Sequence, residues 1–117
     1  MTNPSKRKGN DAEHGAANWI AEHRGLVAKR PPAGAPLDAG DLVISTPTGQ
    51  ILPWHIDVKN RQRWNVEAWM RELTAEAAQQ STEHLRMKPL LILKRAGIGN
   101  QHAGRWLAVV HLEDLEL

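Results

Sequence analysis

The sequence contains no cysteine among its 117 residues, which excludes disulfide bonds, cysteine nucleophiles, iron–sulfur clusters and cysteine-ligated zinc. Any metal ligands must therefore come from oxygen and imidazole groups. No stretch approaches the roughly 18 consecutive apolar residues of a membrane helix, so no membrane partner is expected. The first residues also lack the apolar segment of a signal peptide, and we expect a cytoplasmic protein.

Length and composition are typical of a single folded domain. A chain of 117 residues with 41% hydrophobic and 24% charged residues can bury one core, and neither a disordered nor a multi-domain protein fits. Residues 1–10 are polar and basic and include proline and glycine. We expect a flexible basic arm there, followed by one domain over residues 11–117.

Basic residues are clustered although the net charge is only +2. Three runs contain no acid, namely Lys6, Arg7 and Lys8, then Lys59, Arg61 and Arg63, and then Arg86, Lys88, Lys94 and Arg95. Clusters of this kind favour a nucleic-acid partner, with the first two runs contacting phosphates. An ordinary solvated surface produces the same pattern, so charge alone does not decide.

Hydrophobic periodicity predicts two helices and five strands. The first helix covers residues 11–23, with Asn10 or Asp11 as N-cap and Gly25 as its stop, and the second covers residues 66–80. Short apolar runs predict strands at 26–28, 42–44, 51–59, 90–93 and 106–110. The second and third strands should form a hairpin, residues 97–104 should connect the last two, and the helix between the third and fourth indicates a parallel crossover. The expected fold is α/β, with a mixed central sheet of about five strands flanked by helices.

Three acidic residues and one lysine lie where they could act together. Glu13 is on the first predicted helix, Asp41 begins a strand, and Asp57 and Lys59 emerge on the same side of the next strand because side chains alternate with period two. Phosphodiester hydrolysis needs a divalent cation held by carboxylates and an activated water, which a nearby lysine can assist. Mg²⁺ prefers such an oxygen site.

Each of these residues also has an ordinary structural explanation. Asp38 competes with Asp41 for the start of the strand. Acids are favoured in the first turn of any helix, which accounts for Glu13 without chemistry. Asp57 and Lys59 could be a solvent-facing pair on an edge strand.

The six histidines show no spacing typical of zinc ligands, so no zinc site is expected. His55 shares a strand face with Asp57, and we expect it to be partly exposed.

The order of these segments resembles the PD-(D/E)xK nuclease superfamily and, within it, the archaeal-type Holliday junction resolvases, which also occur in phage genomes. The resemblance covers roughly residues 6–111. Four segments carry it: K-G-N-D-A-E at 8–13, like a basic-glycine segment leading to a helix glutamate; G-L-V-A-K-R at 25–30, like a strand ending in arginine; A-G-D-L-V at 39–43, like the first aspartate motif; and I-D-V-K-N-R at 56–61, like the (D/E)xK strand.

This resemblance implies a restriction-endonuclease-like core and a metal-dependent DNA endonuclease. Glu13, Asp41, Asp57 and the backbone carbonyl of Val58 would hold Mg²⁺, with Mn²⁺ as a substitute, and Lys59 would assist the water. A homodimer would resolve four-way DNA junctions. DNA contacts are expected from Lys6, Arg7, Lys8, Arg30, Arg61 and Arg63. The alternatives are a restriction-like or repair nuclease on another DNA substrate, and an inactive nuclease-fold DNA-binding protein.

Overall fold

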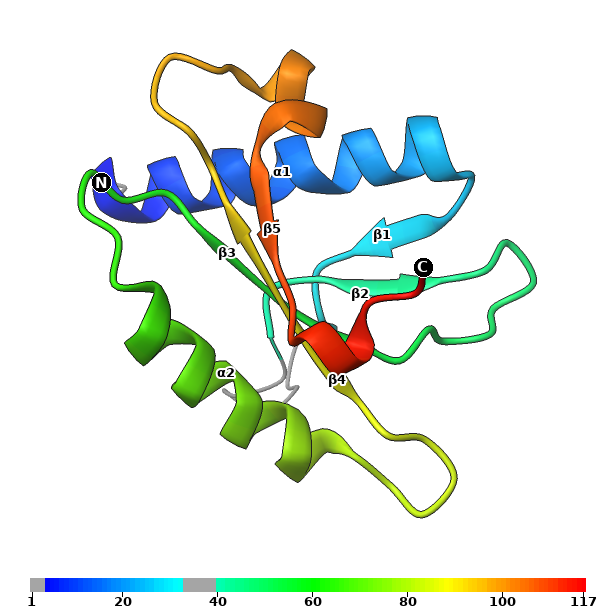
Figure 1. Cartoon of the computed structure of the whole chain (residues 1–117). Helices are drawn as coiled ribbons and strands as arrows, with labels where there is room; N and C mark the ends of the chain where they lie inside the picture. The colour runs from blue at the N-terminus through cyan, green and yellow to red at the C-terminus, as the bar shows by residue number, and fades with distance from the viewer. Residues whose placement is uncertain (1–3, 33–39) are drawn as a thin grey trace.

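A computed structural model describes residues 4–32 and 40–117 of the chain, with side chains from residue 10 onward (Figure 1). Two α-helices, five short strands and two 3-10 helices follow one another along it. In chain order they are α1 (Pro4–Arg24), β1 (Val27–Lys29), β2 (Val43–Ser45), β3 (Trp54–Lys59), α2 (Val66–Gln80), β4 (Lys88–Leu93), η1 (Asn100–Arg105), β5 (Leu107–Val109) and η2 (Leu112–Asp114).

Helix α1 begins earlier than the sequence pattern predicts. It starts at Pro4, so Asn10 and Asp11 lie inside the helix and the N-cap prediction is wrong. The segment expected as an irregular arm is helical from Pro4 onward, while residues 1–3 lie outside the described residues. Proline is favoured in a first helical turn, and Gly9 costs only about 1 kcal/mol relative to alanine, too little to end the helix. The predicted stop is confirmed, since Gly25 has a φ of 65°.

The strands confirm a mixed α/β fold but divide into two sheets. Strands β1 and β2 form an antiparallel pair, while β3, β4 and β5 form a three-stranded sheet. In the latter, β3 and β4 are parallel and β4 and β5 antiparallel. Helix α2 connects β3 to β4, which is the predicted parallel crossover. The connection between β4 and β5 joins antiparallel neighbours as expected, and it contains η1.

The predicted hairpin between the second and third strands is reduced to two contacts. Isolated antiparallel bridges pair Leu42 with Ile56 and Ser45 with Ile51. A continuous ladder does not form, because β2 pairs with β1 along its other edge and Pro53 has no N–H to donate. The five strands therefore form sheets of two and three strands that these bridges join, and a continuous five-stranded sheet is not seen.

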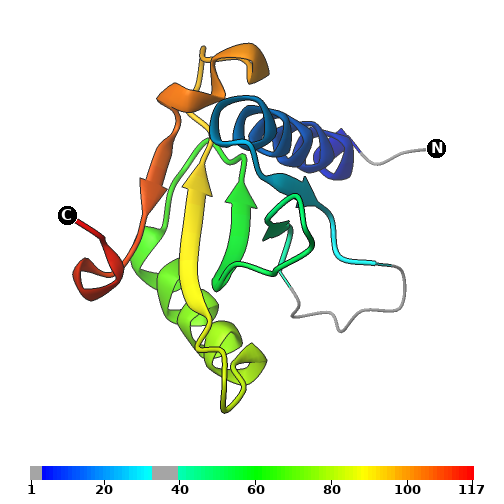
Figure 2. The same ribbon diagram turned by 90° about the vertical axis from the view of Figure 1, so that its right-hand side faces the viewer.

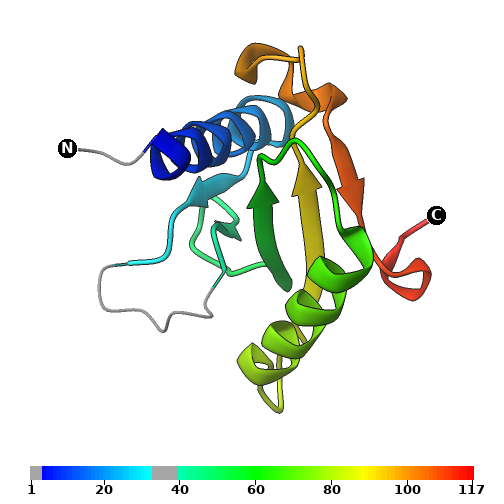
Figure 3. The ribbon, with the colours of Figure 1, turned by 90° about the vertical axis from the view of Figure 1, so that its left-hand side faces the viewer.

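The two helices pack on opposite faces of the three-stranded sheet. Alternate side chains of β4 separate the faces, since Leu91 and Leu93 pack with α2 whereas Leu90 and Ile92 lie toward α1. Figures 2 and 3 show β3 and β4 running between the helices. Neither α1 nor α2 combines the length and apolar character needed to cross a bilayer, within the part of the chain described.

Candidate active site

Asp41 is fixed against the edge of β3, next to the isolated bridge between Leu42 and Ile56. Its backbone N–H donates to the Ile56 carbonyl at 2.7 Å. Its carboxylate Oδ2 accepts the Val58 N–H, also at 2.7 Å. The side chain of Asp41 thus replaces a strand partner for β3, and this double attachment places the carboxylate beside the strand that carries Asp57 and Lys59.

Gly40 allows this close approach. Its φ is +88°, and a Cβ atom there would lie 2.9 Å from the Ile56 carbonyl oxygen and 3.3 Å from the His55 ring. Both the backbone conformation and the space exclude a larger residue. The glycine before Asp41 is therefore a structural requirement of the site.

The structure brings Glu13, Asp41 and Asp57 together from α1, the segment before β2, and β3. Asp41 lies between the other two, and the pKa of its carboxyl group responds to both Asp57 and Glu13. We call these three residues the acidic row. Asp38, the alternative to Asp41, lies outside the described residues.

Two acids of the row, Asp41 and Glu13, have a raised pKa. Burial, followed by the hydrogen bond and the negative charge of Asp57, raises the pKa of Asp41 to about 8, although the Val58 N–H opposes this shift. Burial also raises the pKa of Glu13, against the opposing charge of Arg30. The site is therefore short of positive charge, and a bound cation would stabilise its ionised form.

Arg30 pairs with Glu13 at the outer end of the row. Its Nε lies 3.0 Å from Glu13 Oε2, and the two side chains are 52% and 12% exposed, respectively. Another Arg30 nitrogen, Nη2, donates to Asn10 Oδ1 at 2.9 Å. Glu13 Oε2 is buried and accepts no hydrogen bond, so the contact with Arg30 is ionic only. The residue predicted to contact DNA thus also neutralises part of the site, a long-range pairing that sequence inspection missed.

Lys59 lies at the other end of the row. Its Nζ is 3.1 Å from Asp57 Oδ2 and its side chain is 22% exposed. The ammonium group also lies 5.7 Å from the centre of the Trp69 ring on α2, an arrangement that favours a cation. Asp57 and Trp69 together hold the ammonium group beside the carboxylates.

The residues of the site suit a magnesium-like ion. Val58 donates its N–H toward Asp41, and because the N–H and C=O of a strand residue point to the same edge, its carbonyl faces that side too. Among the described residues, the group whose ligand atoms all lie within 4.8 Å of one another is His111, Glu113 and Asp114. The carboxylates of the acidic row are therefore spaced more widely than the ligand atoms of that group. Mg²⁺ takes only one or two carboxylates and keeps several waters, so an extended row with the buried, unbonded Glu13 Oε2 fits it.

Solvent reaches the acidic row through a cleft of about 370 Å³. Its lining consists of Glu13, Arg30, Pro31, Gly40 and Asp41. An ion or a phosphate group can therefore approach Glu13 and Asp41 from this cleft, whereas Asp57 is not part of its lining.

His55 corrects one expectation from the sequence. It is 2% exposed rather than partly exposed, because α2 covers this face of β3. Its Nε2 lies 3.3 Å from Glu76 Oε2 on α2. The buried imidazole also packs close to Gly40. His55 therefore helps to form the framework of the site and does not face a ligand.

The remaining predicted DNA contacts lie in two places. Arg61 and Arg63 are exposed in the segment that directly follows β3, which continues from Lys59. Lys6, Arg7 and Lys8 belong to the first turns of α1, and their side chains are outside the described part.

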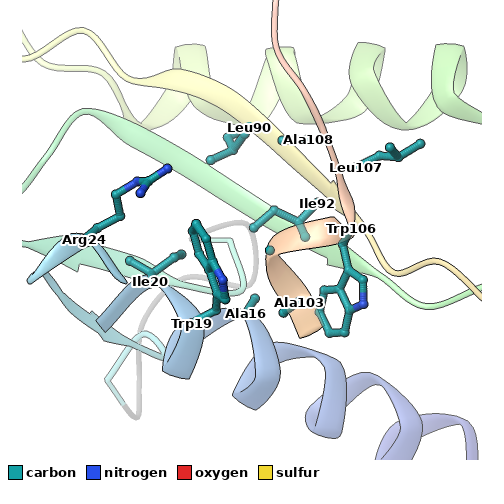
Figure 4. A pocket seen from close by; sticks show the side chains of 11 residues that line it. Ala16, Trp19, Ile20, Arg24, Leu90, Ile92, Ala103, Trp106, Leu107 and Ala108 are labelled. Atoms are coloured by element: carbon teal, nitrogen blue, oxygen red, sulfur yellow. The ribbon is translucent and has the colours of Figure 1, made fainter. Parts of the chain in front are cut away.

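A separate apolar groove lies between α1, η1 and the strands β4 and β5 (Figure 4). Its volume is about 270 Å³, and Trp19, Ile20, Leu90, Ile92 and Trp106 line much of it. Arg24 at its rim is the one charged residue in the lining. Because it lacks converging polar groups, the groove does not carry acid–base or metal chemistry.

The chain matches no family model, no curated protein and no solved structure. The geometry and electrostatics of the acidic row are therefore the features that bear on function.

Proposed function

We propose that the protein is a Mg²⁺-dependent DNA endonuclease similar to the archaeal-type Holliday junction resolvases. One observation carries this proposal: Glu13, Asp41 and Asp57 come from three separate elements and meet in a charge-deficient row with Lys59 beside it. Burial beside Asp57 raises the pKa of the Asp41 carboxyl group to about 8. A bound cation would offset the cost of ionising these buried acids, which supports a cation site.

The residues of the site have distinct roles in this proposal. Asp41, Asp57, Glu13 and the Val58 carbonyl would hold the metal ion, which when bound would supply charge neutralisation on the phosphoryl oxygens and a Lewis acid for activating water. Lys59, positioned by Asp57 at 3.1 Å, orients the attacking water and stabilises negative charge as the phosphodiester bond breaks.

Binding of DNA draws on the basic residues around the site. Arg61 and Arg63 are exposed just beyond Lys59, and both can contact phosphates on either side of the cleaved bond. Lys6, Arg7 and Lys8 add positive charge near the start of α1. Arg30 can move from Glu13 to a phosphate, since its side chain is half-exposed.

The proposed substrate is a four-way junction and the proposed assembly a homodimer, which presents two acidic rows to one junction. Purified protein is incubated with a labelled junction, a linear duplex and a single strand, each with and without Mg²⁺. We expect paired symmetric nicks in the junction only, and only with the metal. Light scattering of the same sample measures the mass of the assembly, for which twice 13.0 kDa is expected.

Asp57→Ala provides the test of the site, and Glu67→Ala on the exposed surface of α2 is the matched control. The first variant should bind the junction without cutting it, whereas the second should cut normally. Metal-dependent cleavage of a duplex or a single strand would support the proposed active site but contradict the proposed junction substrate. Binding with no cleavage in any metal would contradict the enzyme proposal.

A further inference from the structure

His111, Glu113 and Asp114 form a second group of potential ligands, far from the acidic row in the chain. We call them the C-terminal cluster. They lie at the end of β5 and in η2, drawn in red in Figure 1. One ligand atom from each can be chosen so that all three lie within 4.8 Å of one another.

Asp114 has one oxygen with no partner. The side chain is only 1% exposed, and its Oδ1 accepts from Arg86 Nη1 at 3.3 Å. Its Oδ2 is buried and receives no hydrogen bond. A buried carboxylate oxygen without a donor is costly, so some positively charged or donating group is expected to complete it.

The hydrogen bonds of Thr74 determine which ring nitrogen of a neutral His111 carries the hydrogen. Thr74 on α2 donates its single hydroxyl hydrogen to the Met70 carbonyl at 2.5 Å. Its oxygen lies 3.4 Å from His111 Nε2 and must therefore accept from it. In the neutral ring, this assignment leaves Nδ1 without a hydrogen and with a free lone pair.

His111 Nδ1 is the ring nitrogen that lies near the unpartnered Asp114 oxygen. The two atoms are 3.9 Å apart, which is too long for a hydrogen bond but close to the span across which one ion can contact both. Fixing the remote ring nitrogen of a histidine by a protein acceptor is also what ordinarily prepares the other nitrogen for a metal.

Glu113 and Arg86 complete the surroundings. Arg86 contacts both acids, with its Nη2 3.3 Å from Glu113 Oε1. One guanidinium against two carboxylates leaves a net negative charge, which attracts a cation. Glu113 is 70% exposed, so its carboxylate can turn toward the ion while Arg86 keeps its bond to Asp114 Oδ1.

Two of the three ligands are open to solvent. His111 borders a cleft of about 620 Å³, and the Glu113 side chain is 70% exposed. An ion could therefore reach these two ligands directly.

We propose that the C-terminal cluster binds a divalent transition metal, of which Zn²⁺ is the representative, through His111 Nδ1, Asp114 Oδ2 and Glu113. One imidazole with two carboxylates suits Zn²⁺ better than Mg²⁺, which prefers oxygen alone. All three ligands lie within residues 111–114, so the ion would hold the turn from His111 into η2 in one conformation, and its role would be structural. This proposal is independent of the nuclease proposal because it uses none of the same residues.

Zn²⁺ titration of the tag-free full chain by isothermal calorimetry, with excess Mg²⁺ to occupy oxygen sites, tests the proposal. The wild-type protein should bind one Zn²⁺, and His111→Gln should weaken binding at least about tenfold. His84→Gln, which changes an exposed histidine, is the matched control and should bind as the wild type does. Absence of Zn²⁺ binding in the wild type, or equal binding in His111→Gln, would overturn the proposal.

Nitrogen NMR of the wild-type histidines gives a readout that does not depend on a variant folding. Before Zn²⁺ is added, His111 should show a protonated Nε2 and an unprotonated Nδ1, and Zn²⁺ should shift the Nδ1 resonance. A shift confined to other histidines would contradict the assignment. Thr74→Val removes the acceptor that fixes the ring and should weaken Zn²⁺ binding while leaving all three ligands in place.

Discussion

The acidic row and the C-terminal cluster both contain buried carboxylates, but their positive charges are placed differently. Arg86 contacts both acids of the C-terminal cluster at 3.3 Å. In the acidic row, Arg30 pairs with Glu13 and Lys59 with Asp57, and among the described residues no lysine or arginine pairs with Asp41. Burial, followed by the hydrogen bond and the charge of Asp57, raises the pKa of this middle acid to about 8. An acidic group that the protein leaves uncompensated indicates a place for an external cation.

Breaking the acidic row at its outer end should have the largest effect. Glu13→Gln removes a charge that faces Asp41 but keeps the shape of the side chain, and we expect Mg²⁺-dependent cleavage of the junction to fall at least about a hundredfold. Glu22→Gln alters an exposed acid on the same helix and should leave the rate unchanged. Equal rates for the two variants would remove Glu13 from the site.

Gly40→Ala should damage the acidic row by displacing Asp41. The φ of +88° alone costs about 1–3 kcal/mol for a residue with a side chain, and the contact at 2.9 Å with the Ile56 carbonyl adds to it. Gly49→Ala is the matched control, since Gly49 has a φ of +96° but no atom within 4 Å of its added Cβ. Chemical denaturation should show the larger loss for Gly40→Ala, and equal losses would mean that the close approach is unimportant.

Arg86→Ala tests the C-terminal cluster by removing the positive charge that compensates its two acids. It leaves the buried Asp114 carboxylate without its donor, which should cost about 1–3 kcal/mol of unfolding free energy. Arg71→Ala breaks an equally exposed arginine pair with Glu67, whose carboxylate is in water, and should cost less than about 0.5 kcal/mol. Urea denaturation of both variants tests this; a loss for Arg71→Ala as large as that for Arg86→Ala would show that burial of the acid is irrelevant.

A smaller effect is expected on the pH dependence of stability. Because the pKa of Asp41 is raised to about 8 from an ordinary value of 3.8, the folded metal-free protein retains a proton that the unfolded chain has lost between those values. Stability from this group is therefore full below about pH 4 and declines as the pH rises toward 8. Asp41→Asn stays neutral and can still accept the Val58 N–H, so its melting temperature should fall less between pH 5 and 8. Identical pH profiles would contradict the raised pKa.

The sequence predicts well what depends on local periodicity. Helix α2 and strand β4 lie where their apolar spacing places them, because burial on one face of an element leaves a repeating pattern. The predicted start of α1 was wrong, since Pro4 and the residues after it can enter a helix although their composition is typical of a loop. The structure shows sheets of two and three strands rather than one continuous sheet, because pairing between strands depends on partners that local patterns do not specify.

The candidate site divides in the same way. The alternation along β3 placed Asp57 and Lys59 on one side, and the structure keeps them 3.1 Å apart. The pairing of Arg30 with Glu13, the burial of His55 under α2 and the contact of His111 with Thr74 all join residues far apart in the chain. Only the tertiary structure brings such residues together, so no short sequence motif predicts these contacts.

The central claim is that the acidic row binds a divalent cation, and calorimetric titration with Mg²⁺ at pH 7 in two buffers of different ionisation enthalpy tests it most directly. Because the pKa of Asp41 is about 8 in the metal-free protein, binding should release about one proton per ion. His111→Gln should behave as the wild type, whereas Asp41→Asn should bind more weakly and release no proton. Absence of Mg²⁺ binding, or unchanged binding and proton release in Asp41→Asn, would contradict the account.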